Sequence, residues 1–205
     1  MKNLNITKLK TDYLTADEKQ NQAVQDVIAG ENEQLLLLEL DDVYTAGTSA
    51  NIERDYLDKS IPLVKTGRGG QLTYHGPGQV VAYPIINLSK REKDLRKYVK
   101  NLQTWIINTL KHFNIEAFIT DEVGVWVETP SGRKKIAAIG IRVRKWVTFH
   151  GIALNVNPDL SKFGGIVPCG ITEFGVTSIS ESLGKDVTNE EIEEILVKEF
   201  KKIFF

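Results

Sequence analysis

The sequence contains a single cysteine, Cys169, and this scarcity excludes several kinds of site. One cysteine cannot form an intramolecular disulfide or build a cysteine-based zinc site. The longest apolar run, Leu35 to Leu38 with Leu40 after it, is far shorter than the roughly 20 residues that span a bilayer. The first ten residues carry no continuous apolar stretch like that of a secretory signal. We therefore expect a cytoplasmic protein with no membrane partner.

The charge of the chain is nearly balanced. A formal net charge of −1 gives no general attraction to nucleic acid or to an anionic surface, so neither is expected as a partner. At 205 residues, with 41% apolar and 26% charged side chains, the chain is long enough for one sizeable core. No linker or internal repeat divides it. We expect one domain that spans residues 1–205.

Helical periodicity marks three parts of the chain. Thr15 and Glu18 match a capping box before an amphipathic stretch that ends near Gly30. A longer apolar stripe runs from Leu95 to Phe113 at close to 3.6-residue spacing. A second capping box, from Thr188 to Glu191, opens a C-terminal helix.

Strand patterns fill much of the remaining sequence. A proline at position 84 favours an edge strand or a bulge for its segment. The expected strands cover residues 35–40, 61–65, 79–88, 117–120, 123–127, 136–143 and 146–156. Because helices and strands do not alternate strictly, the pattern predicts an α+β fold with a mixed or antiparallel sheet flanked by helices.

A glycine-rich segment, residues 67–84, is one of two unusual stretches. Five glycines between Gly67 and Gly78 indicate exposed backbone or close backbone approach. The segment fits neither of the standard phosphate-binding patterns, and the chain lacks the G-x-S-x-G turn of serine hydrolases. His75 and His150 each precede a glycine, but they have no metal-ligand spacing, so we expect no metal.

The second unusual stretch contains Cys169, which stands between Pro168 and Gly170. A lone thiol in this setting is either an inert, buried side chain or a nucleophile on a stiff turn. Its residue type alone favours the inert interpretation.

Lys135 begins the expected strand K-I-A-A-I-G-I-R-V. Regular alternation would place it on one face with Ala137, Ile139 and Ile141. A lysine at the head of an apolar row has a partly desolvated amine and can act as a base or as the partner of a thiolate. A strand-end lysine with its amine in water is the alternative interpretation.

Three long blocks carry a resemblance to a known family. They are R-G-G-Q-L-T-Y-H-G-P-G-Q-V-V-A-Y-P, K-I-A-A-I-G-I-R-V-R-K-W-V-T-F-H-G-I-A-L-N-V-N, and F-G-G-I-V-P-C-G-I followed by V-T-S-I. Together, in this order and at these separations, they closely resemble the signature blocks of the octanoyl-acyl-carrier-protein:protein octanoyltransferases. The resemblance implies the fold shared by the catalytic domains of biotin and lipoate protein ligases.

The resemblance also implies roles for individual residues. Cys169 matches the acyl-accepting nucleophile, and Lys135 matches the lysine that activates the thiol and moves protons. His150 is expected to line the site without acting as a base. The expected walls of the acyl pocket are Arg68, Gly69, Gly70, Gln71, Leu72, Thr73, Tyr74, His75, Ala138, Ile139, Gly140, Gly151, Ile152 and Ala153.

The implied reaction moves an octanoyl group from octanoyl-acyl carrier protein to a lysine of a lipoyl domain. The expected acceptors are the lipoyl domains of 2-oxoacid dehydrogenases and the glycine-cleavage carrier protein. The donor carries its own phosphopantetheine, so no cofactor, ATP or metal is expected. Three alternatives stay open: an ATP-dependent lipoate or biotin protein ligase, a cysteine amidotransferase acting between lipoyl proteins, and a non-catalytic module that binds lipoyl domains.

Basic side chains offer two candidate docking sites for an acidic carrier protein. One is the pair Arg142 and Arg144, which share a strand face. The other is the group Lys90, Arg91 and Lys93 before the long helix. A solvated surface with no partner is the alternative for both.

Overall fold

The computed structural model describes residues 4–167 and 175–205 and contains helices on both sides of a sheet. The strands are β1 (Leu4–Thr11), β2 (Glu33–Leu40), β3 (Val43–Ala46), β4 (Leu63–Lys65), β5 (Leu72–His75), β6 (Gln79–Ile85), β7 (Ala117–Phe118), β8 (Val125–Thr129), β9 (Gly132–Arg144) and β10 (Val147–Asn155). The α-helices are α1 (Tyr13–Ala29), α2 (Ile52–Asp55), α3 (Leu95–Lys111), α4 (Ile179–Leu183) and α5 (Asn189–Phe204). Two short 3-10 helices are η1 (Leu88–Lys90) and η2 (Leu160–Gly165).

Within the described residues, the main sheet has the strand order β1-β2-β6-β10-β9-β8-β7. Only β1 and β2 pair in parallel in this sheet, and the other neighbours are antiparallel. A small sheet of order β4-β3-β5 accompanies it. The expected α+β class with a mixed sheet is therefore confirmed, although the edge strand β1 was not predicted from the sequence.

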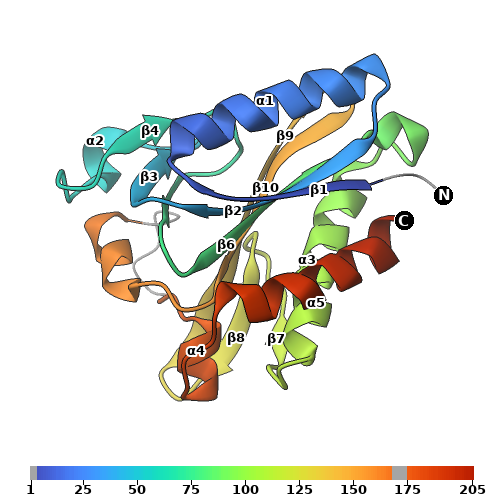
Figure 1. The fold of residues 1–205 in the computed structure, drawn as a ribbon. Coiled ribbons are helices and arrows are strands. Elements are labelled where there is room, and N and C mark those ends of the chain that lie inside the picture. Colours follow the sequence, from blue (N-terminus) through green and yellow to red (C-terminus); the bar gives the residue numbers. More distant parts are fainter. Residues whose placement is uncertain (1–3, 168–174) are drawn as a thin grey trace.

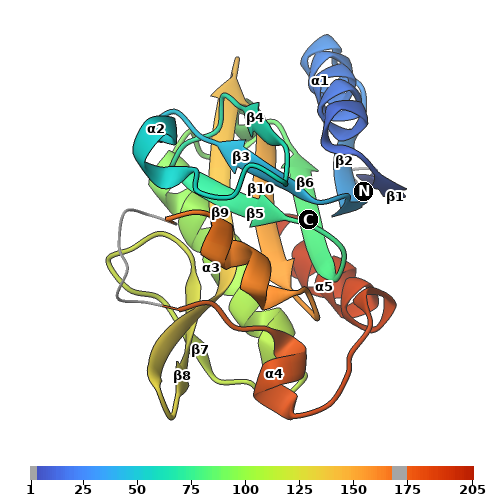
Figure 2. The same ribbon diagram turned by 90° about the vertical axis from the view of Figure 1, so that its left-hand side faces the viewer.

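The helices divide between the two faces of the main sheet (Figure 1). Helix α1 lies over β2, β6 and β10, whereas α3 and α5 lie side by side on the opposite face. The small sheet stands in front of β9 and β10 when the molecule is turned by 90° (Figure 2).

The core between the main sheet and α3 and α5 is the larger of the two cores that the helices form on the sheet. Trp105 of α3 is fully buried there and donates its indole N–H to the Leu196 carbonyl oxygen at 2.7 Å. Its ring also packs on Phe200, with 4.9 Å between the centroids. These contacts bring the two predicted amphipathic helices together through their apolar faces.

Capping boxes were predicted at the starts of two helices, and one of the two is present. The capping box predicted at Thr188 and Glu191 is present at the start of α5. The box predicted at Thr15 is wrong, because α1 begins at Tyr13 and Asp12 is its N-cap. Asp12 accepts from two backbone N–H groups, and the Thr15 hydroxyl donates to the same carboxylate. Gly30 ends the helix in the left-handed conformation, as expected.

Strand β6, which contains Pro84, is not at an edge of the sheet, so of the two alternatives expected for its segment the edge strand is wrong. Strand β6 lies between β2 and β10. Its ladder with β10 ends at Ala82, before the proline is reached. Beyond that point the Thr148 hydroxyl donates to the Pro84 carbonyl oxygen at 2.7 Å. The proline is tolerated because the ladder on this side is already interrupted.

Candidate active site

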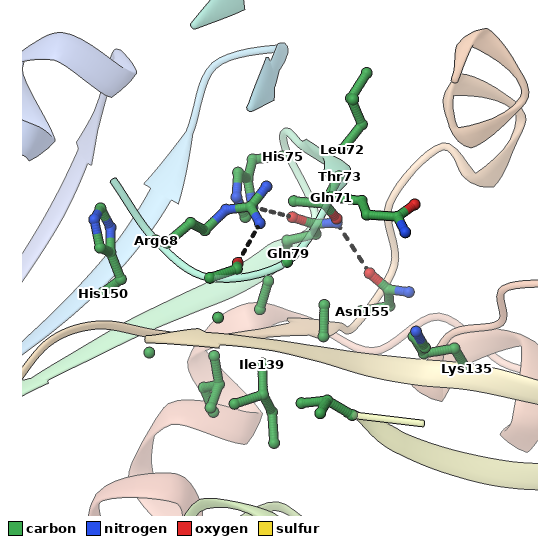
Figure 3. Close-up of a pocket in the computed structure, with 18 of the residues that line it drawn as sticks. Arg68, Gln71, Leu72, Thr73, His75, Gln79, Lys135, Ile139, His150 and Asn155 are labelled. Carbon is green, nitrogen blue, oxygen red and sulfur yellow. Dashed lines mark hydrogen bonds between the residues drawn. The ribbon is translucent and has the colours of Figure 1, made fainter. Parts of the chain in front are cut away.

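A cavity of about 280 Å³ lies between the glycine-rich segment before β5 and the pocket-facing side of β9 and β10 (Figure 3). Lys135 stands at one end of it, and His150 stands at the other. Both residues were predicted from the sequence. The other predicted residues that line the cavity are Arg68, Gly69, Gly70, Gln71, Leu72, Thr73, His75, Ala138, Ile139, Gly140, Gly151, Ile152 and Ala153.

Tyr74 is the one described residue of the predicted pocket wall that does not line the cavity. Its side chain is fully buried on the other side of β5. Its hydroxyl donates to Asp42 at 2.7 Å, and its ring packs edge-on against Phe163. Thr73 and His75, its neighbours in the strand, line the cavity, whereas Tyr74 packs in the small core with Tyr44 and Phe163.

Cys169, the predicted nucleophile, lies outside the described residues. The described chain on each side of it is held by backbone hydrogen bonds. Before it, the Val167 N–H donates to the Asp55 carbonyl oxygen at 2.9 Å. After it, Gly175 accepts from the Lys135 N–H, and the Thr177 N–H donates to the Lys135 carbonyl oxygen, both at 3.0 Å. Residues 175–177 are therefore attached to the backbone of Lys135.

A β-bulge determines which way Lys135 points. Val125 pairs with Ala137, but the next residue, Trp126, pairs with Lys135, so Ile136 has no partner across the ladder. Ile136 and Ala137 are consequently both packed in the core under α3 and α5. The expectation that Lys135 shares a face with Ala137 is wrong, because the extra residue turns Lys135 to the cavity side.

Buried amides connect the cavity to the segment after Cys169. The His75 ring contacts Gln79 Oε1 through Nδ1 at 3.3 Å. The Gln79 amide N–H donates to Asn155 Oδ1 at 3.0 Å (Figure 3), and the Asn155 amide donates to the Thr177 carbonyl oxygen at 2.9 Å. Burial, helped by the charge of Arg68, lowers the pKa of His75 to about 3. His75 is therefore a neutral hydrogen-bonding residue and a poor general base.

His150 is held at the other end of the cavity by Gln20 of α1. The His150 backbone N–H donates to Gln20 Oε1 at 2.9 Å, and Gln20 Nε2 lies 3.3 Å from the ring Nδ1. Because the backbone group can only donate, the amide orientation is fixed, and Nδ1 accepts from Nε2. Burial, followed by the charges of Arg68 and Arg142, lowers the pKa of this ring to about 3. His150 also has a φ of 55°, which the Gln20 contacts support.

Arg68 fixes the glycine-rich segment over the cavity. Its Nη2 donates to the carbonyl oxygen and to the hydroxyl of Thr45, at 2.7 and 2.8 Å. Its Nη1 donates to the Gly69 carbonyl oxygen at 3.0 Å (Figure 3). The buried guanidinium thus joins the segment to the small sheet. The result is a cavity wall that is set before any substrate binds.

Gly140 of β9 and Gly151 of β10 pair with each other, but a larger side chain is excluded at the two positions for different reasons. A Cβ on Gly151 would lie 2.2 Å from the Ala82 carbonyl oxygen, which is backbone and cannot move away. A Cβ on Gly140 would lie 3.0 Å from Arg68 Cδ, over the cavity. Close strand packing therefore explains Gly151, whereas Gly140 makes room for the side chain that covers the cavity.

Sequence analysis missed several residues of the lining. Gln79 and Asn155 could have been noticed as isolated amides within apolar strand patterns. Tyr83, Phe163 and Val176 lie within the three sequence blocks but were not assigned to the pocket. Tyr13, Glu122 and Val123 come from segments that no local pattern marks. The missed lining residues are Tyr13, Gln79, Tyr83, Glu122, Val123, Asn155, Phe163 and Val176.

The two groups of basic side chains predicted as docking sites lie away from the Lys135 end of the cavity. Arg142 and Arg144 stack near Phe149 at the hairpin end of β9. Arg142 is seven residues, or roughly 23 Å, along the strand from Lys135, and Arg144 is two residues further. Arg91 forms an ion pair with Glu33 and donates to the Phe204 carbonyl oxygen. Neither group therefore flanks the Lys135 end of the cavity.

The described residues contain no group of three or more histidine, cysteine, aspartate or glutamate side chains placed to bind a metal ion. Nor does that part of the chain include a helix with the length and apolar character needed to cross a membrane.

Solved structures identify the fold. The chain superposes on a structure described as that of a bipartite lipoate protein ligase and its E2 lipoyl domain from Thermoplasma acidophilum, with a TM-score of 0.76 at 18% identity. That match covers 99% of this chain and 84% of the other. A biotin protein ligase from Aquifex aeolicus, in complex with biotin and ATP, matches with a TM-score of 0.58 at 17% identity, over 98% and 70% of the two chains. The fold is that of the lipoate and biotin protein ligases.

Sequence comparison gives the family. Residues 12–201 match the lipoyl protein ligase A/B catalytic domain, so the chain belongs to that family. An octanoyltransferase from Wolbachia pipientis wMel is 50% identical over 94% of this chain and 95% of its own length. One from Rickettsia canadensis (strain McKiel) is 49% identical over 95% of each chain. The resemblance found in the three sequence blocks is thereby confirmed.

Proposed function

We propose that this protein is an octanoyltransferase, an acyltransferase that moves an octanoyl group from acyl carrier protein to a lysine of a lipoyl domain. The observation that carries the proposal is the cavity that ends at Lys135, whose backbone is hydrogen-bonded to Gly175 and Thr177, a few residues after Cys169 in the sequence. The octanoyltransferase relatives, about 50% identical over nearly the whole chain, support it. The proposal treats residues 1–205 as one catalytic domain.

In the first half of the reaction, the thiolate of Cys169 attacks the thioester carbonyl carbon of the donor. The bond between that carbon and the pantetheine sulfur breaks, and Lys135 gives its proton to the departing sulfur. The products are an octanoyl thioester on Cys169, a pantetheine thiol and a neutral Lys135 amine. The ammonium matters at the start because an unassisted thiol is only a few per cent thiolate near pH 7.

In the second half, the neutral amine of the acceptor lysine attacks the thioester on Cys169. Lys135 takes the proton that this nitrogen loses, and the bond between the carbonyl carbon and Cys169 breaks. The enzyme returns to thiolate and ammonium, so protons balance over one cycle. Because an amide is more stable than a thioester, the transfer needs no ATP. His75 and His150 take no proton in this scheme, which agrees with their lowered pKa values.

The proposed partners follow from the reaction. The donor is octanoyl-acyl carrier protein, and the acceptors are the lipoyl domains of 2-oxoacid dehydrogenases and the glycine-cleavage carrier protein. A free catalytic thiol also requires a reducing compartment, so we propose a cytoplasmic location.

An ATP-dependent ligase is the second candidate, because ATP is bound in a lipoate-protein ligase A that matches this fold with a TM-score of 0.73 at 18% identity. A transfer assay separates the two. The purified protein is mixed with a lipoyl domain and either octanoyl-acyl carrier protein without ATP or free octanoate with ATP. We expect octanoylated lipoyl domain only in the first mixture. If octanoylated lipoyl domain formed only in the second mixture, the protein would be an ATP-dependent ligase. If it formed in neither mixture, the protein would be a module that binds lipoyl domains without catalysis.

A further inference from the structure

The bulge that turns Lys135 to the cavity also places it beside Trp126. The two residues are directly opposite each other in the β8–β9 ladder, so their side chains lie on the same face. Lys135 Nζ is 4.7 Å from the centroid of the Trp126 ring. The Trp126 side chain is only 2% exposed, whereas Lys135 is half-buried. The lysine ammonium therefore stands over an aromatic face that is shielded from water.

Gly124, two residues before Trp126, supports the rest of the lysine side chain. It has a φ of 142°, a conformation that favours glycine. A Cβ there would lie 2.9 Å from the Ala137 carbonyl oxygen and 3.2 Å from Lys135 Cε. The lysine methylenes thus pass over bare backbone before the ammonium reaches the ring. A side chain at position 124 would push them away.

The chain around Trp126 is itself anchored. Gln103 of α3 donates to the Gly124 carbonyl oxygen at 3.3 Å. The Trp126 indole N–H points to the Glu122 carbonyl oxygen at 3.5 Å. The backbone at Gly124 and the buried Trp126 ring are thus each held by one hydrogen bond, so the ring can position the lysine in turn.

We propose that Trp126 is a positioning residue for the transfer reaction, holding the Lys135 ammonium at the end of the cavity through a cation–π contact. The inference rests on the proposed role of Lys135 as the proton carrier. An aromatic ring attracts the ammonium and has no such attraction for the neutral amine. The ring therefore holds the ammonium at the end of the cavity, where the first half of the reaction needs its proton. A ring that only fills the core would stabilise the fold without this effect on rate.

The test compares Trp126→Leu with Trp126→Phe in single-turnover acylation by saturating octanoyl-acyl carrier protein. We expect Trp126→Leu to lower the acylation rate about 2- to 30-fold, the range of a cation–π contact, with little change in the apparent KM of the donor. Trp126→Phe keeps an aromatic face and should restore much of the rate. Trp146→Leu is the matched control, because it removes a similar contact, with Lys93, at the remote hairpin end of β9.

A double-mutant cycle with Lys135→Ala shows whether the ring acts through the lysine. The rate effect of Trp126→Leu should disappear once Lys135 is absent. If Trp126→Leu slowed acylation equally with and without Lys135, the inference would be overturned and the proposed function would stand. The same holds if Trp126→Leu acylated at the wild-type rate while Lys135→Ala was slow. Wild-type acylation by Lys135→Ala would instead remove the lysine from the proposed function, and the inference with it.

If Trp126→Leu does not fold, fluorinated tryptophan at position 126 provides a second test. Fluorine draws charge from the ring face but hardly changes its size, so the core packing is kept. We expect the acylation rate to fall stepwise as fluorines are added. A rate that does not respond to fluorination contradicts the proposal.

Discussion

The two buried histidines of the cavity make the stability of the protein depend on pH in a defined window. His75 and His150 both have a pKa lowered from 6.5 to about 3, in each case mainly by burial and then by the charge of Arg68. The unfolded chain therefore binds protons at these rings below about pH 6.5, while the folded protein does not. Their contribution to stability is complete above pH 6.5 and is lost as the pH falls from 6.5 towards 3.

The size of the effect follows from the width of the window. Each pH unit within it changes the free energy of unfolding by about 1.4 kcal/mol per ring. Between pH 6.5 and 5.0 each histidine should cost about 2 kcal/mol, and the two together about 4 kcal/mol. A domain of this kind is stable by only about 5–15 kcal/mol, so the loss is large.

Urea unfolding at closely spaced pH values between 7 and 5 measures this directly. The variants His75→Gln and His150→Asn each remove one ring, and asparagine tolerates the positive φ at position 150. The informative quantity is the slope of the unfolding free energy against pH, because a loss of stability that is independent of pH does not alter it. We expect each variant to reduce the slope by about half of the histidine contribution. Wild-type slopes in both variants would refute the neutral, buried state of these rings.

Three further substitutions test other parts of the structure. Gly151→Ala would place a methyl group against a β6 carbonyl oxygen, so thermal unfolding should show a loss of about 1–3 kcal/mol; Gly164→Ala, in open space, should change stability little. Gln20→Leu leaves the His150 N–H without its acceptor and should cost about 1–3 kcal/mol in urea unfolding, and unchanged stability would contradict the contact. Lys135→Ala should slow acylation by about 100-fold or more at unchanged secondary structure by circular dichroism, whereas a normal rate excludes it as proton carrier.

Local patterns in the sequence predicted many of the elements but not all of their boundaries. The capping box at Thr188 was found because both of its partners are close in sequence and nothing nearby competes. The start of α1 was misplaced because Asp12 and Thr15 are both good N-cap residues, and only the observed hydrogen bonds distinguish them. The parallel pairing of β1 with β2 depends on contacts across α1, which no local pattern contains.

In the site, too, features set by local sequence could be predicted and features set by long-range contacts could not. The glycine-rich segment and the strands of the cavity could be predicted because their residues lie in continuous blocks. The orientation of Lys135 could not be predicted, because the bulge at Ile136 arises from the pairing of β8 with β9. The order of apolar and polar residues in β9 does not indicate it. Gln20 was missed because its partner, His150, is 130 residues away in the chain. Such long-range contacts require the structure.

The central claim is that Cys169 carries the octanoyl group between donor and acceptor. The most direct measurement is intact-protein mass spectrometry after mixing the protein with octanoyl-acyl carrier protein, without ATP and without a lipoyl domain. The account predicts one added octanoyl group that hydroxylamine removes, that is transferred when a lipoyl domain is added, and that maps to Cys169. Unmodified protein, or a hydroxylamine-labile thioester that persists in Cys169→Ser, would contradict it.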